Sequence, residues 1–230
     1  MGFFSELGDI FRDTAVSVCT KIGGAVMNGV SKFVARYPEL EIGIMVVLKI
    51  VDIICKVADL LIGKPKDETP EELGLKAERC KEEEGLTPED FASTEAYIDH
   101  LRNDIKVDHE KMAELSKEQL QAYAAIGTGL YVRAMEDRYG MKMEPEFWRA
   151  IYRTNIAPEQ VPALVQSMRA AGVESGKLLD AYLAGTIPAM SADDRIIHTA
   201  LTDYAHQLGA EAPPTIMNMR QNYHTTGGTQ

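Results

Sequence analysis

The sequence predicts an all-α protein in which an apolar N-terminal helical hairpin precedes an acidic multi-helix bundle. Three observations support this fold class. Apolar residues recur with a helical period in the first third of the chain, and helix start and stop signals punctuate the remainder. We find no convincing alternating run of β-branched residues, so we expect no sheet.

The segment from Phe3 to Arg36 predicts the first arm of the hairpin, because polar residues recur there at a helical period and apolar residues fill the other positions. A glycine in a helix interior lowers helix stability by about 1 kcal/mol, so the presence of Gly24 and Gly29 in this arm requires an explanation. Either these small residues let a second helix backbone approach closely, or they accompany a kink at Gly23-Gly24. Tyr37-Pro38 ends the arm, since proline disfavours helical geometry in the residue before it.

The segment from Glu41 to Gly63 predicts the second arm. It is apolar nearly all round, apart from four charged residues that alternate in sign: Lys49, Asp52, Lys56 and Asp59. At about 100° per residue they occupy an arc of roughly 80°, and their spacings of three and four let neighbours pair along one line. We call these four residues the charged stripe.

The second arm has the length of a membrane span but the wrong charge. It would be roughly 33 Å long, close to the ~30 Å hydrocarbon core of a bilayer. Four charges near the bilayer centre cost on the order of 10–14 kcal/mol, whereas the apolar residues return roughly 4–8 kcal/mol. A lone span is therefore unfavourable. The arm is either the central helix of a bundle with its stripe at the surface, or it enters a membrane with the stripe turned to a partner helix or a pore.

The rest of the chain carries repeated helix-start signals. Thr69-Pro70 and Thr87-Pro88 each place threonine at the N-cap and proline at the first helical position, with acidic residues in the first turn. Glycines mark the stops, as at Gly140 and Gly172. With the two arms included, the expected helices span about 4–35, 41–62, 70–84, 88–104, 107–114, 117–139, 145–154, 158–171, 174–184 and 192–208.

Composition and the helix start and stop signals together predict the layout of the chain. The expected segments are the apolar hairpin 1–63, a polar linker 64–72, a helical bundle 73–212 and an irregular tail 213–230 that begins at Pro213-Pro214. The negative charge is uneven, because residues 64–115 carry a net −8 and the segments on either side only −1 and −2. This concentration of acid indicates solvated helix faces.

Composition also excludes some classes of function. The net charge of −11 argues against nucleic acid as a partner. The 3 cysteines are far apart, lack a Cys-x-x-Cys motif and fit a reducing compartment. The N-terminus has neither a basic region nor a signal-cleavage site, so we expect synthesis in the cytoplasm, with membrane association or export without a cleaved signal left open.

No motif points to a particular chemistry. Asp99-His100 and Asp108-His109 put imidazole beside carboxylate, as general-base pairs and metal sites do, but neither lies in a zinc-binding spacing. We therefore assign no catalytic residue, no cofactor and no metal ligand. The candidate interaction residues are the charged stripe and the close-packing positions Gly24 and Gly29.

Three hypotheses of function follow. In the first, the protein is not an enzyme, and its apolar hairpin docks on a protein partner or self-associates. In the second, the hairpin inserts in a bilayer, by functional analogy with bacterial pore-forming or secreted effector proteins and not by sequence match. In the third, which we favour least, the protein is an enzyme with a diffuse site formed by Asp99, His100, Asp108 and His109.

Overall fold

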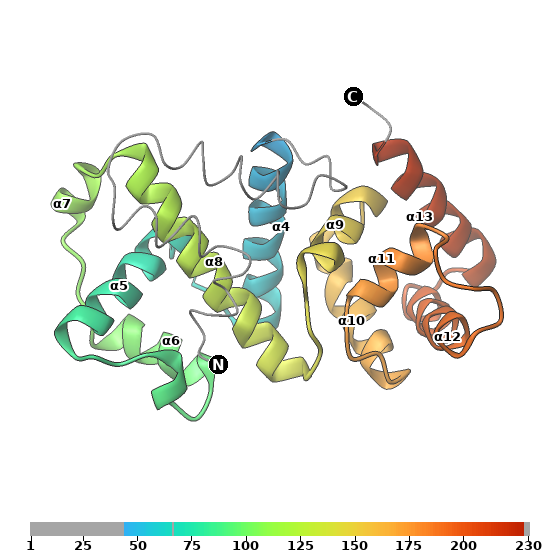
Figure 1. The fold of residues 1–230 in the computed structure, drawn as a ribbon, viewed down its shortest axis with the longest axis horizontal. Helices are drawn as coiled ribbons and strands as arrows, with labels where there is room; N and C mark the ends of the chain where they lie inside the picture. Colours follow the sequence, from blue (N-terminus) through green and yellow to red (C-terminus); the bar gives the residue numbers. More distant parts are fainter. Residues whose placement is uncertain (1–43, 66, 228–230) are drawn as a thin grey trace. The chain divides into compact units, whose positions relative to one another are not determined.

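The computed structural model describes residues 44–65 and 67–227, and this part of the chain is helical, with no strand (Figure 1). The expectation of an all-α protein is confirmed there. The elements are α4 (Ile44–Ile62), α5 (Pro70–Glu83), η3 (Pro88–Asp90), α6 (Thr94–Asn103), α7 (His109–Ala113), α8 (Lys117–Tyr139), α9 (Pro145–Thr154), η4 (Pro158–Gln160), α10 (Val161–Ala170), α11 (Lys177–Leu183), α12 (Ala192–Gln207) and α13 (Ala212–Gly227). The first arm of the expected hairpin lies outside the described residues.

The chain divides into two compact units. The first unit contains the start of α4 and residues 62–134, and the second contains residues 49–61 and the chain from Met135 onward. The chain therefore passes between the units at 48/49 and 61/62, both within α4, and at 134/135 inside α8. Most of α4 groups with helices that follow it by more than 70 residues.

Helices of the first unit begin where the sequence places their caps. The Thr69 side chain accepts a hydrogen bond from the backbone N–H of Glu72 at 3.2 Å, and Pro70 is the first residue of α5. Thr87 forms a capping box with Asp90, but only the short turn η3 follows it. The expected helix over 88–104 is therefore wrong in its first turns, because the backbone of Phe91 is extended and α6 starts anew at Thr94.

Glycines set the closest approach of α5 and α8. A Cβ atom on Gly74 would lie 2.7 Å from the carbonyl carbon of Tyr123, and one on Gly127 would lie 2.8 Å from the carbonyl carbon of Pro70. Real Cβ atoms essentially never come this close to another atom. The two helices thus meet backbone to backbone at two points, each with a glycine on one side, an arrangement that small residues permit.

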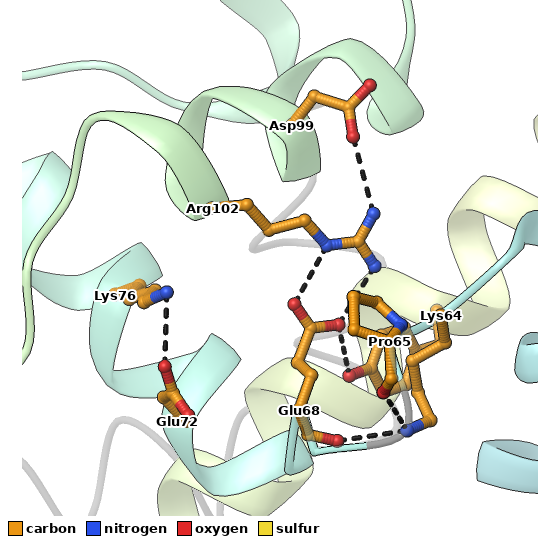
Figure 2. Close-up of polar contacts among 8 residues, drawn as sticks. Lys64, Pro65, Glu68, Glu72, Lys76, Asp99 and Arg102 are labelled. Carbon is orange, nitrogen blue, oxygen red and sulfur yellow. Dashed lines mark hydrogen bonds and ion pairs between the residues drawn. The ribbon is translucent and has the colours of Figure 1, made fainter.

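The segment that the sequence predicts as a linker is fastened to the first unit. Figure 2 shows Arg102 forming two parallel hydrogen bonds to the carboxylate of Glu68, at 2.8 and 2.9 Å. Tyr131 donates a further hydrogen bond to this carboxylate at 2.8 Å, and Lys64 binds the backbone oxygen of Glu68 at 2.9 Å. Burial alone would raise the pKa of Glu68, but these hydrogen bonds and the charge of Arg102 lower it below its usual value.

The second unit has an aromatic and aliphatic core with one buried ion pair. Phe147, Trp148 and Ile151 of α9 are buried, as their helical spacing predicts. The guanidinium of Arg149 pairs with the carboxylate of Asp180 on α11, where its Nε donates at 3.0 Å. Tyr223 of α13 donates to the same carboxylate at 2.8 Å, so three helices meet at this pair.

The expected irregular tail is wrong, because α13 continues from Ala212 to Gly227. Pro213 and Pro214 lie in its first turn, where backbone N–H groups have no partner within the helix and proline is tolerated. Ile216, Met219 and Tyr223 follow at helical spacing, and each is no more than 6% exposed. Their burial against the second unit holds the helix in place.

Candidate functional site

The charged stripe lies on the solvent-facing side of α4. On a helical wheel of about 100° per residue, Ile54, Val57, Ala58 and Leu61 share one arc, and the stripe lies nearly opposite to it. Those four apolar residues are at most 5% exposed, whereas Lys49, Asp52, Lys56 and Asp59 are all exposed. Among the residues that the structure describes, α4 is thus buried along one face and exposed along the other.

One intrahelical ion pair forms within the stripe. Lys56 Nζ lies 2.8 Å from Asp52 Oδ2, and both side chains are more than half exposed. This hydrogen bond, and then the charge of Asp52, raises the pKa of Lys56. Lys49 instead lies over the ring of Tyr152, 6.0 Å from its centroid. Such exposed contacts contribute little to stability, on the order of 0.2–1 kcal/mol each.

The exposed side of α4 is not purely polar. Leu60 is 51% exposed and lies beside the stripe on the helical wheel. Ile53 and Cys55 flank the stripe and are partly exposed. The open face therefore combines alternating charge with apolar edges. The two close-packing glycines, Gly24 and Gly29, lie outside the described residues, so their role stays a prediction.

The residues proposed for a diffuse catalytic site have structural roles in the described part of the chain. Asp99 pairs with Arg102 at 3.3 Å. Asp108 caps α7 by accepting hydrogen bonds from two backbone N–H groups, at 3.1 and 3.2 Å, which lower its pKa. His109 is exposed in the first turn of α7. The geometry gives no support to a shared site of Asp99, His100, Asp108 and His109.

His100 takes its carboxylate partners from elsewhere. Its Nε2 lies 2.7 Å from Glu84 Oε2, and its Nδ1 lies 2.9 Å from Asp104 Oδ2. The hydrogen bond to Glu84 raises the pKa of His100, and the bond to Asp104 adds to the rise. The buried thiol of Cys80 lies beneath the same carboxylate, with Sγ 3.8 Å from Glu84 Oε2.

Sequence reasoning missed this cluster of Cys80, Glu84 and His100. The three side chains come from the last turn of α5, its C-cap and the last turn of α6. Cys80 and Glu84 are four residues apart, as are His100 and Asp104, so each pair shares a helix face. This spacing can be read from the sequence. The docking of α5 on α6, which brings the two pairs together, cannot.

The second unit also contains an open groove of about 690 Å³ between α12 and α13, with Tyr182 at its wall. His198 Nδ1 lies 3.0 Å from the Tyr182 hydroxyl, and Arg220 lies over the Tyr182 ring, 4.2 Å from its centroid. His206 and the exposed Met217 are among the other lining residues. Since His198 and Arg220 each contact Tyr182, packing accounts for their arrangement.

Among the residues that the structure describes, no helix has both the length and the apolar character that crossing a bilayer requires. No protein-family model matches this chain, and neither the curated proteins nor the solved structures include one that is detectably similar to it.

Proposed function

We propose that this protein is a non-enzymatic helical assembly protein that self-associates through its N-terminal 63 residues. In this proposal a second copy of the chain is the partner. The observation that carries the proposal is the order of charges on the open face of α4, which reads positive, negative, positive, negative.

This order is self-complementary when two copies of α4 lie antiparallel across a two-fold axis. Lys49 then faces Asp59 of the second copy, and Asp52 faces Lys56 of the second copy. Such an interface is isologous, because each contact occurs twice by symmetry. A parallel arrangement in register would instead oppose like charges. The stripe thus specifies one orientation of the pair.

The stripe sets the register, and apolar contacts supply the affinity. Four exposed ion pairs contribute about 1–4 kcal/mol in total, whereas a micromolar dissociation constant needs about 8 kcal/mol. Ile53 and Leu60, at the edges of the stripe, add apolar surface. The strongly apolar segment 3–36 adds the remainder, which fits the role of the hairpin as an interaction element.

A charge-swap experiment on the full chain tests this arrangement. The variant Asp52→Lys places two lysines opposite each other at both symmetric contacts, and we expect it to weaken self-association several-fold. The double variant Asp52→Lys, Lys56→Asp restores opposite charges across the axis and should restore association. Sedimentation equilibrium over a range of concentrations and salt measures both, since ionic screening should weaken the wild-type pair.

Two controls separate the stripe from general charge effects. Glu83→Lys makes the same change in net charge at an exposed position of α5 and should leave association unchanged. A wild-type chain that stays monomeric at every concentration, or a double variant as weak as the single one, contradicts the proposal. Flotation of the full chain with liposomes under the same conditions would favour the membrane hypothesis instead.

A further inference from the structure

We propose that Cys80, Glu84 and His100 bind a zinc ion, with Asp104 holding the imidazole in the ligating orientation. The inference is independent of the proposed self-association, because it concerns helices α5 and α6 of the first unit. It also reverses the expectation from sequence that the chain has no metal ligand.

The donor atoms lie close to the separations that a tetrahedral site needs. The thiol sulfur, one carboxylate oxygen and one imidazole nitrogen all lie within 4.8 Å of one another. Zinc takes sulfur at about 2.3 Å and nitrogen or oxygen at about 2.0–2.2 Å, so its ligand atoms stand roughly 3.3–3.7 Å apart. Cys80 Sγ and Glu84 Oε2, at 3.8 Å, nearly match this value. The distance between His100 Nε2 and Glu84 Oε2 is 2.7 Å and would have to increase by less than 1 Å.

The second contact of His100 is the one that zinc-bound histidines have. A ligating histidine donates its other ring N–H to a carboxylate or carbonyl, which fixes the tautomer and turns the free nitrogen to the metal. Here Nδ1 lies 2.9 Å from Asp104 Oδ2, so Nε2 is the nitrogen directed at Cys80 and Glu84. The Phe91 ring packs on the imidazole, with centroids 5.2 Å apart, and restricts its rotation.

The position of the cluster in the fold suits a cation. Cys80 and His100 lie in the last turns of α5 and α6, and Glu84 and Asp104 are the C-caps of these helices. The C-terminal end of a helix carries a partial negative charge of about half an electron, so two helix ends face the ion together. Cys80 is buried, whereas Glu84 is exposed and His100 partly so, which leaves an entry path from solvent.

The donor set selects zinc over harder ions. Thiolate and imidazole suit zinc, whereas calcium and magnesium prefer oxygen ligands. On binding, the Cys80 thiol loses its proton and the ion takes the place of the proton on His100 Nε2, while Glu84 ligates as the carboxylate. Each ion therefore releases up to two protons to solvent, and water can complete the fourth position as in other three-ligand sites.

The test uses the full chain after treatment with a chelator and titrates it with Zn²⁺ and with Co²⁺. Competition against a chromophoric chelator gives the Zn²⁺ affinity and stoichiometry, and Co²⁺ reports a thiolate ligand through its charge-transfer band. We expect one ion per chain and a clear thiolate band. Cys80→Ser should abolish the band, whereas Cys55→Ser, which changes the other described cysteine, should leave it intact.

Further variants guard against misfolding and assign the roles. Glu84 and His100 lie nearer the surface than Cys80. Glu84→Gln and His100→Gln should each weaken Zn²⁺ binding at least tenfold and leave the circular dichroism spectrum unchanged. Asp104→Asn should weaken binding about 10–100-fold yet keep the thiolate band, since it positions the imidazole and does not ligate. Absence of saturable binding, a band that survives Cys80→Ser, or binding that depends on His109 instead of His100 would overturn the proposal.

Discussion

Alanine at Gly74 tests how closely α5 and α8 must approach. The new methyl group would overlap the backbone carbonyl of Tyr123, and neither helix backbone can move aside locally. The two helices therefore have to separate by roughly 1 Å to restore van der Waals contact. Helix propensity alone favours the change, because alanine is about 1 kcal/mol better than glycine in a helix interior.

The packing loss should outweigh the gain in propensity. A gap of about 0.5–1 Å already removes a quarter to a half of the dispersion energy along the opened contact, and overpacking of a well-packed core costs about 1–3 kcal/mol, sometimes more. We therefore expect Gly74→Ala to lower the free energy of unfolding by about 1–3 kcal/mol. For a chain of this size that lowers Tm by about 2–4 °C per kcal/mol.

Urea unfolding followed by circular dichroism measures the effect, and double variants identify its cause. One separation of the helices relieves the overlap at both Gly74 and Gly127, so the two alanines together should cost less than the sum of the single changes. Gly209→Ala is the control, because that glycine has a positive φ of 67° and open space around it. Its cost should add to that of Gly74→Ala in full. A Gly74→Ala variant as stable as the wild type would refute the close-packing argument.

Three further predictions follow from other contacts. Hydrogen bonding lowers the pKa of Glu68, so its contribution to stability is present above the unfolded pKa of about 4.5 and is lost as pH falls through the folded pKa. Glu68→Gln should therefore be less stable than the wild type at pH 7. Its free energy of unfolding, measured with urea from pH 7 to 3, should also fall less steeply with decreasing pH. Asp180→Ala leaves the guanidinium of Arg149 buried without its partner and should cost about 3–5 kcal/mol in thermal or urea unfolding, whereas a loss below 1 kcal/mol would show that the pair is solvated. Thr69→Ala removes the N-cap hydrogen bond of α5 and should cost about 1 kcal/mol, while Thr69→Ser should retain most of the stability.

Local signals explain what the sequence predicted well. The expected helix over 145–154 matches α9, because proline at its start and the spacing of Phe147, Trp148 and Ile151 both lie within the segment. The burial of one face of α4 opposite the charged stripe was likewise readable from the period of its apolar residues.

The errors and omissions have a common physical origin in contacts between distant segments. Pro213-Pro214 is compatible with a break or with a helix start, and only the burial of Tyr223 by the second unit decides for the helix. The proximity of Cys80 and His100 depends on how α5 docks on α6, which no local pattern encodes. For the same reason, no local pattern reveals the ion pair between Glu68 and Arg102, which are 34 residues apart.

The grouping of α4 with the second unit has a consequence for synthesis on the ribosome. The apolar face formed by Ile54, Val57, Ala58 and Leu61 emerges before the whole of 62–134 and before any later residue of its own unit. At about 5–20 residues per second, roughly 4–15 s pass before the ribosome has made residues 62–134 and reaches the next segment of that unit. The first unit can complete most of its contacts in this interval. Nascent chains stopped near residue 134 should therefore be the species most prone to aggregate or to engage a chaperone.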